Sequence, residues 1–277
     1  MGKYFTKTVV PDCVMGDLSD FYTGGDGVNL AANDLIADWT AVDIPKGTCL
    51  LRSISLICNT PDGGATKPAT DFVLVFAKDV NGNAPTSIKG DGFGLIAAIN
   101  GSIREHIVGA IKVEGTSGDE DGGIPVVNDF AGVQVLQVGE AGGAEGGGQT
   151  GSPSLPMVIE LDPDSGTNVG YDKLHVAVLN AAGTTSFETN VLSNYASGAP
   201  DVDSTTTIVV DTVDATKLFS IGDTIYNGTD GSDTAIGVVK SVSALAIELE
   251  ANNAVAIAND EEILNGNPIR IKLGFER

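Results

Sequence analysis

Short runs in which hydrophobic and polar residues alternate recur along this chain, separated by clusters of turn-forming residues. Near the C-terminus, Ile269, Ile271 and Leu273 alternate with Arg270 and Lys272. Because successive side chains of a strand point to opposite faces of a sheet, this spacing predicts a strand with one buried and one solvated face. Alternating or wholly apolar runs predict further strands at 47–59, 71–79, 133–138, 157–161, 174–179, 207–210, 223–226, 236–239 and 246–249. Many short strands of this kind predict a mainly β chain with antiparallel sheets.

The run GTCLLRSISLICN, residues 47–59, shows the alternation most clearly. It places Leu50, Ile54, Leu56 and Cys58 on one face of the predicted strand. The chain has three cysteines, and they lack the spacing of metal ligands. Cys58 is therefore expected to be a buried, reduced thiol rather than part of a disulfide framework.

One segment has a different period. Between residues 94 and 112 a large apolar residue stands at every fourth position, namely Leu95, Ile99, Ile103, Ile107 and Ile111. This spacing predicts one amphipathic helix that packs on the sheets. Gly101 lies inside the segment, and glycine costs about 1 kcal/mol relative to alanine in a helix.

The stretch ASGAPDVDST, residues 196–205, predicts a domain boundary, because proline and small polar residues precede a new strand pattern there. The expected architecture is an antiparallel β-sandwich over residues 1–200 and a small barrel-like, all-β module over residues 203–277. Within that module, the Asn-Gly and Asp-Gly pairs of 226–231 predict a hairpin, because these residues tolerate positive φ.

Residues 1–25 mix aromatic and apolar side chains with glycines and lysines, without a clear period. One interpretation is an extended arm that lays apolar side chains into grooves of a partner. The other is that the segment forms the first strand of the N-terminal domain. Under the first interpretation, the candidate contact residues are Tyr4, Phe5, Val9, Val10, Val14, Phe21 and Tyr22.

The charge balance disfavours some partners. The chain has 15 Lys and Arg residues against 37 Asp and Glu residues, which gives a formal net charge of −22. Attraction to nucleic acid or to anionic membranes requires basic residues, so neither is an expected partner. No apolar run approaches the roughly 18 residues of a membrane span. The N-terminus lacks the apolar core of a secretory signal, which predicts synthesis in a cytoplasm.

The residues give little support for catalysis or for a cofactor. His106 and His175 have no histidine partner at metal-ligand spacing, and the common nucleophile and phosphate-binding motifs do not occur. A pair of carboxylates could serve a glycosidase. However, such enzymes usually bind sugars on aromatic side chains, and aromatic residues are 5% of this chain. We therefore expect no enzyme, no catalytic residue and no cofactor.

Some acidic turns could hold a cation. Asp79, Asn81 and Asn83 stand at the spacing of the first ligands of an EF-hand loop, but Ala84 replaces the required glycine. The other candidate pairs are Asp119 with Asp121 and Asp162 with Asp164. Turn formation explains all of these residues without a metal, so no metal site is predicted and Ca²⁺ binding stays open.

The predicted C-terminal module resembles a recurring β module of tailed-bacteriophage virion proteins. In that module an F-x-x-GD-x-I strand is followed by a turn, an I-G-x-V-x-S-V strand and an I-x-L strand. The first motif corresponds here to Phe219, Gly222, Asp223 and Ile225. The second corresponds to Ile236, Gly237, Val239, Ser241 and Val242. The segment DIPKGTCLLRSISLICN, residues 43–59, is also similar in style to structural proteins of marine phages.

The resemblance implies a non-enzymatic virion protein of the capsid decoration, or cement, type. Such a protein binds the outer surface of the major capsid protein and stabilises the shell. The expected location is the exterior of the virion, and the expected assembly is a homo-oligomer, with a trimer favoured by the three-fold positions of a shell. The open alternatives are a tail-associated or receptor-binding fibre protein and, less in keeping with the residues, a carbohydrate-active enzyme.

Overall fold

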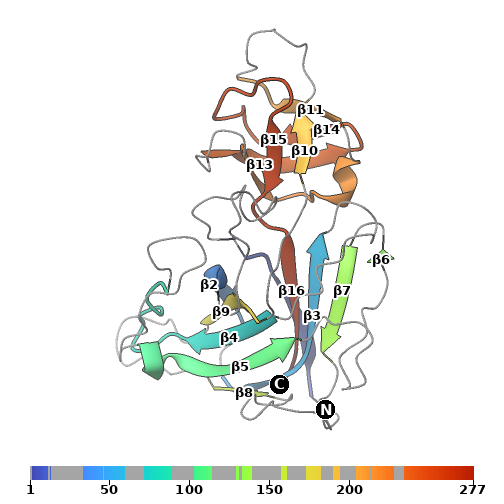
Figure 1. Ribbon diagram of the computed structural model, residues 1–277. Coiled ribbons are helices and arrows are strands. Elements are labelled where there is room, and N and C mark those ends of the chain that lie inside the picture. The colour runs from blue at the N-terminus through green and yellow to red at the C-terminus, as the bar shows by residue number, and fades with distance from the viewer. Residues whose placement is uncertain are drawn as a thin grey trace.

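The computed structural model in Figure 1 describes residues 2–11, 13, 34–45, 47–59, 72–88, 103–113, 129–130, 133–138, 157–160, 173–181, 190–193, 204–211, 214–227 and 234–277. Within these residues the protein is mainly β, and the strands pair antiparallel, as the sequence predicts. Two one-turn 3₁₀ helices, η2 (Ile103–Glu105) and η3 (Ala215–Lys217), are the helical elements of the described part.

The strands form two sheets and one closed barrel (Figure 1). The first sheet runs in the order β1 (Tyr4–Val9), β16 (Ile269–Glu276), β3 (Cys49–Asn59), β7 (Val133–Val138) and β6 (Asp129–Phe130), and β8 (Met157–Ile159) also pairs with β3. The second sheet runs in the order β2 (Leu35–Asp43), β9 (Lys173–Asn180), β4 (Phe72–Lys78) and β5 (Ile107–Val113). The barrel runs in the order β10 (Asn190–Ser193), β11 (Thr207–Asp211), β14 (Ala246–Leu249), β13 (Thr234–Ser243), β12 (Thr224–Asn227) and β15 (Glu262–Asn265).

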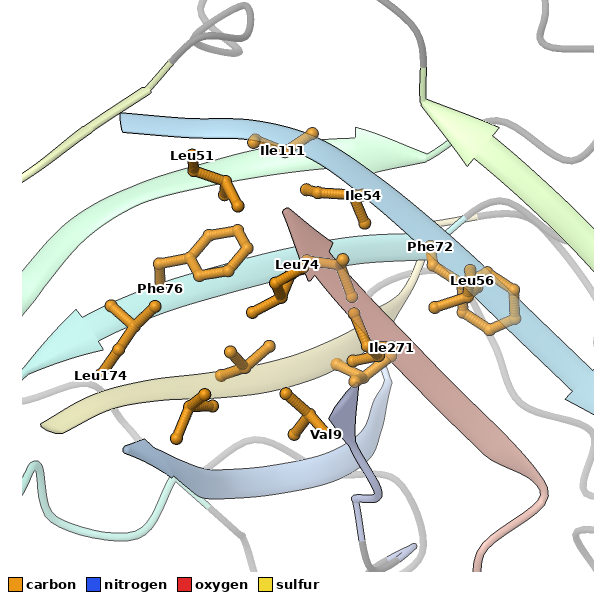
Figure 2. Close-up of a cluster of buried hydrophobic side chains, with 14 of the residues drawn as sticks. Val9, Leu51, Ile54, Leu56, Phe72, Leu74, Phe76, Ile111, Leu174 and Ile271 are labelled. Carbon is orange, nitrogen blue, oxygen red and sulfur yellow. The ribbon is translucent and has the colours of Figure 1, made fainter. Parts of the chain in front are cut away.

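The main hydrophobic core lies between the two sheets. Figure 2 shows side chains of β3 and β16 pointing toward side chains of β4 and β9. Leu56 and Ile271 of the first sheet and Leu74 and Leu174 of the second are completely buried. Burying one such side chain stabilises the fold by about 1.5–3 kcal/mol, so this layer accounts for most of the cohesion between the sheets.

The barrel has a separate core. Its strands turn Ile208, Ile225, Ile236 and Ile247 inward, and Phe219 from the loop before β12 packs among them. Because the strand order closes on itself, the barrel presents no strand edge. The hairpin predicted from the Asn-Gly and Asp-Gly pairs is confirmed by the antiparallel pairing of β12 with β13.

All the strands predicted from alternating or apolar runs are confirmed, with shifts at their ends. The interior strand β9 of the second sheet is buried on both faces over most of its length, and its neighbour β4 has one fully buried and one partly buried face. This explains their almost unbroken apolar sequences. Of the predicted boundary segment 196–205, only the last two residues lie in the described part.

The helix predicted over 94–112 is wrong where the structure describes it. Residues 103–105 form η2 and residues 107–113 form β5, while residues 94–102 lie outside the described part. A spacing of four is even, so it keeps residues on one face of a strand as well as near one face of a helix. The β-branched residues of IVGAIKV then favour the strand, and Gly109 disfavours the helix.

The last strand does not belong to the C-terminal module in which the sequence placed it. β16 lies between β1 and β3 in the first sheet, and Ile271 faces Val9 on one side and Leu56 on the other. Residues 203–277 are therefore divided between the barrel and the first sheet, and β10 enters the barrel from the N-terminal side. We call β1 to β9 with β16 the two-sheet body. Alternation shows which face of a strand is buried, but it does not identify its neighbours.

Candidate functional site

A β-bulge in β3 sets the geometry of the surface described next. Along the pairing of β16 with β3, Gly274 lies opposite Ser53 and Phe275 lies opposite Leu51, so Arg52 is the extra residue. The predicted position of Leu50 on the buried face is therefore wrong, because Leu51 and Ile54 are both fully buried. The bulge instead turns Arg52 toward the outer face of the sheet.

On that outer face Arg52 joins Glu276 and Tyr4. The Arg52 Nη2 and Glu276 Oε2 atoms lie 2.5 Å apart, and Arg52 Nε donates to the same oxygen at 2.6 Å. The Tyr4 hydroxyl donates to Glu276 Oε1 at 3.0 Å. Both carboxylate oxygens are thus occupied, and three adjacent strands are linked near the two chain ends. The two chain ends lie close together (Figure 1). Lys3 and Arg277 exchange two backbone hydrogen bonds there.

The contacts perturb two ionisable groups in opposite directions. Hydrogen bonds from Arg52 and then from Tyr4 lower the pKa of Glu276. The same carboxylate raises the pKa of Tyr4, because it accepts the phenolic hydrogen and carries negative charge. Since the Glu276 pKa is lowered in the folded state, its contribution to stability is present above its ordinary pKa of 4.5 and is lost as the pH falls through the lowered value.

Replacing Arg52 with glutamine is expected to raise the pKa of Glu276 toward 4.5, because the guanidinium is the main cause of the shift. Carboxyl chemical shifts followed by NMR against pH measure this value. Lys240→Gln is a matched control, since Lys240 makes another exposed pair, with Glu248, at 2.5 Å. The control should raise the pKa of Glu248 and leave that of Glu276 unchanged. An unaltered Glu276 pKa in Arg52→Gln would contradict the assigned cause.

A pocket of about 320 Å³ opens beside this cluster. Its lining comprises Tyr4, Phe5, Thr6, Arg52, Ser53, Gly274 and Phe275. Gly274 packs closely against Ser53, because a Cβ atom added there would lie 2.2 Å from the Ser53 Oγ. Hydroxyl groups and a guanidinium can hold a polar group by hydrogen bonds.

The predicted contact residues divide into three groups. Tyr4 and Val10 are exposed, at 73% and 37% of their surface, and Phe5 is half-buried against Phe275 with ring centroids 5.1 Å apart. Val9 is only 3% exposed and belongs to the main core, so it cannot contact a partner. Val14, Phe21 and Tyr22 lie outside the described residues. Over residues 4–9 the N-terminal segment is a strand of the first sheet.

The sequence did not indicate Arg52, Ser53, Gly274 or Glu276 as members of this surface. These residues come from two strands that are far apart along the chain. Their meeting depends on the pairing of β16 with β3 and on the bulge, and neither leaves a local pattern in the sequence.

The residues of the F-x-x-GD-x-I motif lie in the barrel core and at the contact between the barrel and β16. Phe219 and Ile225 are buried in the barrel core, and Gly222 adopts a φ of +88°, which favours glycine. Asp223 is completely buried and forms an ion pair with Arg270 of β16. The aspartate of the motif therefore connects the barrel to the two-sheet body.

Asparagines extend this connection. The Asp223 Oδ2 accepts from the Ser220 amide at 2.7 Å and from Asn265 Nδ2 at 2.9 Å. Asn267 donates from Nδ2 to the Pro11 carbonyl at 3.0 Å, and its Oδ1 accepts from the Thr224 amide at 2.8 Å. We call Asp223, Asn265, Asn267 and Arg270 the junction network. Its members satisfy one another's buried polar groups, as such groups require.

Both histidines hold elements of the second sheet together. His175 Nε2 on β9 lies 2.6 Å from Asp79 Oδ1 just after β4, and both side chains are buried. His106 Nδ1 lies 2.8 Å from the Lys78 carbonyl oxygen. These contacts give each ring a structural position between neighbouring strands.

The possible cation ligands at 79–83 form a tight turn. Asn81 and Gly82 have φ values of 50° and 74°, and two 3.0 Å backbone hydrogen bonds between Val80 and Asn83 close the turn. The Asp79 carboxylate contacts the His175 ring at 2.6 Å. The pairs at 119–121 and 162–164 lie outside the described residues.

The described residues contain neither a cluster of metal ligands nor a membrane-spanning helix. In that part of the chain, no group of three or more His, Cys, Asp or Glu side chains is placed to hold a metal ion. No helix there has the length and hydropathy needed to cross a membrane. Comparison with known proteins finds no family model, no curated protein and no solved structure that matches this chain.

Proposed function

We propose that this protein is a non-enzymatic structural protein of a virion, and specifically a head decoration protein that binds the outer surface of the capsid and stabilises it. The main support is the use that the fold makes of the F-x-x-GD-x-I motif. Phe219 and Ile225 build the barrel core, and Asp223 attaches the barrel to the last strand of the two-sheet body. A motif used in this way specifies an architecture, which is what its resemblance to phage virion modules implies.

The architecture in this proposal is a β-sandwich that carries a small barrel, with the major capsid protein as its partner. The formal net charge of −22 suits the outside of a shell, away from the packaged nucleic acid. Binding to the assembled shell stabilises that shell by mass action. Many copies bound to one particle make modest individual contacts sufficient.

Labelling of intact particles tests the location. Gold-conjugated antibodies against the protein should decorate the heads of particles from the virus that encodes it, and an antibody that has been absorbed with purified protein serves as the control. Label confined to the tail would overturn the decoration proposal and favour a fibre-associated protein. A second measurement is the thermal stability of the head, which should fall in particles that lack the protein.

A further inference from the structure

We infer that the pocket beside Arg52 is a binding site for an uncharged sugar, either free or as the end of a glycan chain. The pocket has a volume of about 320 Å³. Sites for small ligands measure roughly 300–1,000 Å³, so this pocket is at the lower end of that range. Its size suits one small ligand, and the chemistry of its walls identifies the class of that ligand.

Two hydroxyl groups lie at the floor of the pocket, on three neighbouring strands of the first sheet. Thr6 of β1 lies opposite Gly274 of β16, and Gly274 lies opposite Ser53 of β3. Thr6 and Ser53 are exposed, and the Ser53 Oγ occupies space that a side chain at Gly274 would fill. Each hydroxyl can donate one hydrogen bond and accept others. The hydroxyls of a sugar have the same two capacities, so they can pair with this floor.

Tyr4 supplies an aromatic wall. This residue is 73% exposed, and its hydroxyl donates to Glu276 Oε1 at 3.0 Å. The hydrogen bond orients the ring before a ligand arrives, which reduces the entropy lost on binding. A sugar ring has apolar C–H groups on its faces and hydroxyls around its rim. It can therefore pack a face on Tyr4 while its rim bonds to the floor.

The ion pair of Arg52 with Glu276 favours an uncharged ligand. Arg52 directs Nε and Nη2 at Glu276 Oε2, which uses two of the five N–H donors of a guanidinium. The Arg52 side chain is 40% exposed, so its outer donors can reach a ligand hydroxyl. A bound anion would lie close to the Glu276 carboxylate, and a bound cation would lie beside the guanidinium. A sugar without charge avoids both repulsions.

Titration of the isotopically labelled full chain, followed by NMR, tests the ligand class. The probes are glucose, galactose, mannose and N-acetylglucosamine, each added alone. Glycerol is the control for hydroxyls without a ring, and inorganic phosphate is the control for an anion. At least one sugar should shift the amide signals of Thr6, Ser53 and Gly274 along a saturable curve, and neither control should do so. No saturable shift with any of the four sugars, or a stronger response to phosphate, would overturn the inference.

A pair of tyrosine variants tests the aromatic wall. Tyr4→Phe and Tyr4→Leu both lose the hydroxyl that bonds to Glu276, but only Tyr4→Phe keeps the ring. The dissociation constant for the sugar should therefore be about tenfold higher in Tyr4→Leu than in Tyr4→Phe. Thr6→Ala should also weaken binding, whereas Thr8→Ala, which removes an exposed hydroxyl from the same face of β1, should not. Equal affinities within either pair would contradict the assigned site.

Filling the floor of the pocket gives an independent test. A Cβ atom at Gly274 would collide with the Ser53 Oγ but would lie 3.5 Å from the Ser53 Cβ, an ordinary contact. Ser53→Ala combined with Gly274→Ala should therefore fold with a melting temperature close to that of Ser53→Ala alone. Ser53→Ala should weaken sugar binding several-fold, and the double variant should abolish it. Full sugar binding by a folded double variant would overturn the inference. These measurements use purified protein, so their outcome is independent of any role in a virion.

Discussion

Replacing Asp223 with alanine is expected to reduce the free energy of unfolding by about 3–5 kcal/mol, the usual loss when one partner of a buried ion pair is removed. Asp223 is completely buried, and its partner Arg270 is only 16% exposed along its side chain. The variant leaves that guanidinium without its counter-charge and leaves the Ser220 amide without its acceptor. Denaturant titration followed by circular dichroism measures the change.

Asp214→Ala is the matched control, because Asp214 is an only partly buried aspartate in the same region that caps η3 by accepting from the Thr216 amide at 3.0 Å. Its loss should be much smaller. Burial raises the pKa of Asp223 in spite of the nearby Arg270, so the environment does not favour the charge itself. Removing both charges, in Asp223→Leu with Arg270→Met, should therefore restore part of the lost stability. Equal losses in Asp223→Ala and Asp214→Ala would refute this account.

Alternation was a reliable guide to strands for a physical reason. A strand buried on one face must repeat every two residues, as β16 does, and a strand with no exposed position on either face is almost wholly apolar, as β4 is. The β5 segment was misread because a spacing of four fits both a strand and a helix. Only its tertiary neighbour β4, with which it pairs over its whole length, decides between them.

The candidate site could be predicted only in part. Tyr4 and Phe5 were predicted as contact residues because they are aromatic residues in a segment without a clear period. Both line the pocket. Arg52 and Glu276 are separated by most of the chain, and their contact arises from the pairing of β16 with β3 and from one extra residue in β3. Long-range pairing of this kind is set by the whole fold, so no local sequence pattern reports it.

The second large effect follows from the place of β16. Ile271→Ala is expected to cost about 2–5 kcal/mol, because it leaves a cavity among fully buried side chains of the two-sheet body. Ile247→Ala makes the same chemical change at a fully buried position in the barrel core. The two variants should therefore lose similar stability and differ in which strands they loosen.

Native-state hydrogen exchange locates that loosening. Ile271 faces Val9 and Leu56 across its neighbouring strands, so Ile271→Ala should speed exchange mainly in β1, β3 and β16 itself. Ile247 faces Ile208 and Val242, so Ile247→Ala should speed exchange mainly in β11 and β13. If the last strand belonged to one module with the barrel, Ile271→Ala would loosen β11 to β14 and spare β3. That outcome would contradict the sheet order. The expected outcome would mean that a chain segment following the barrel completes the core that the chain began to build before it.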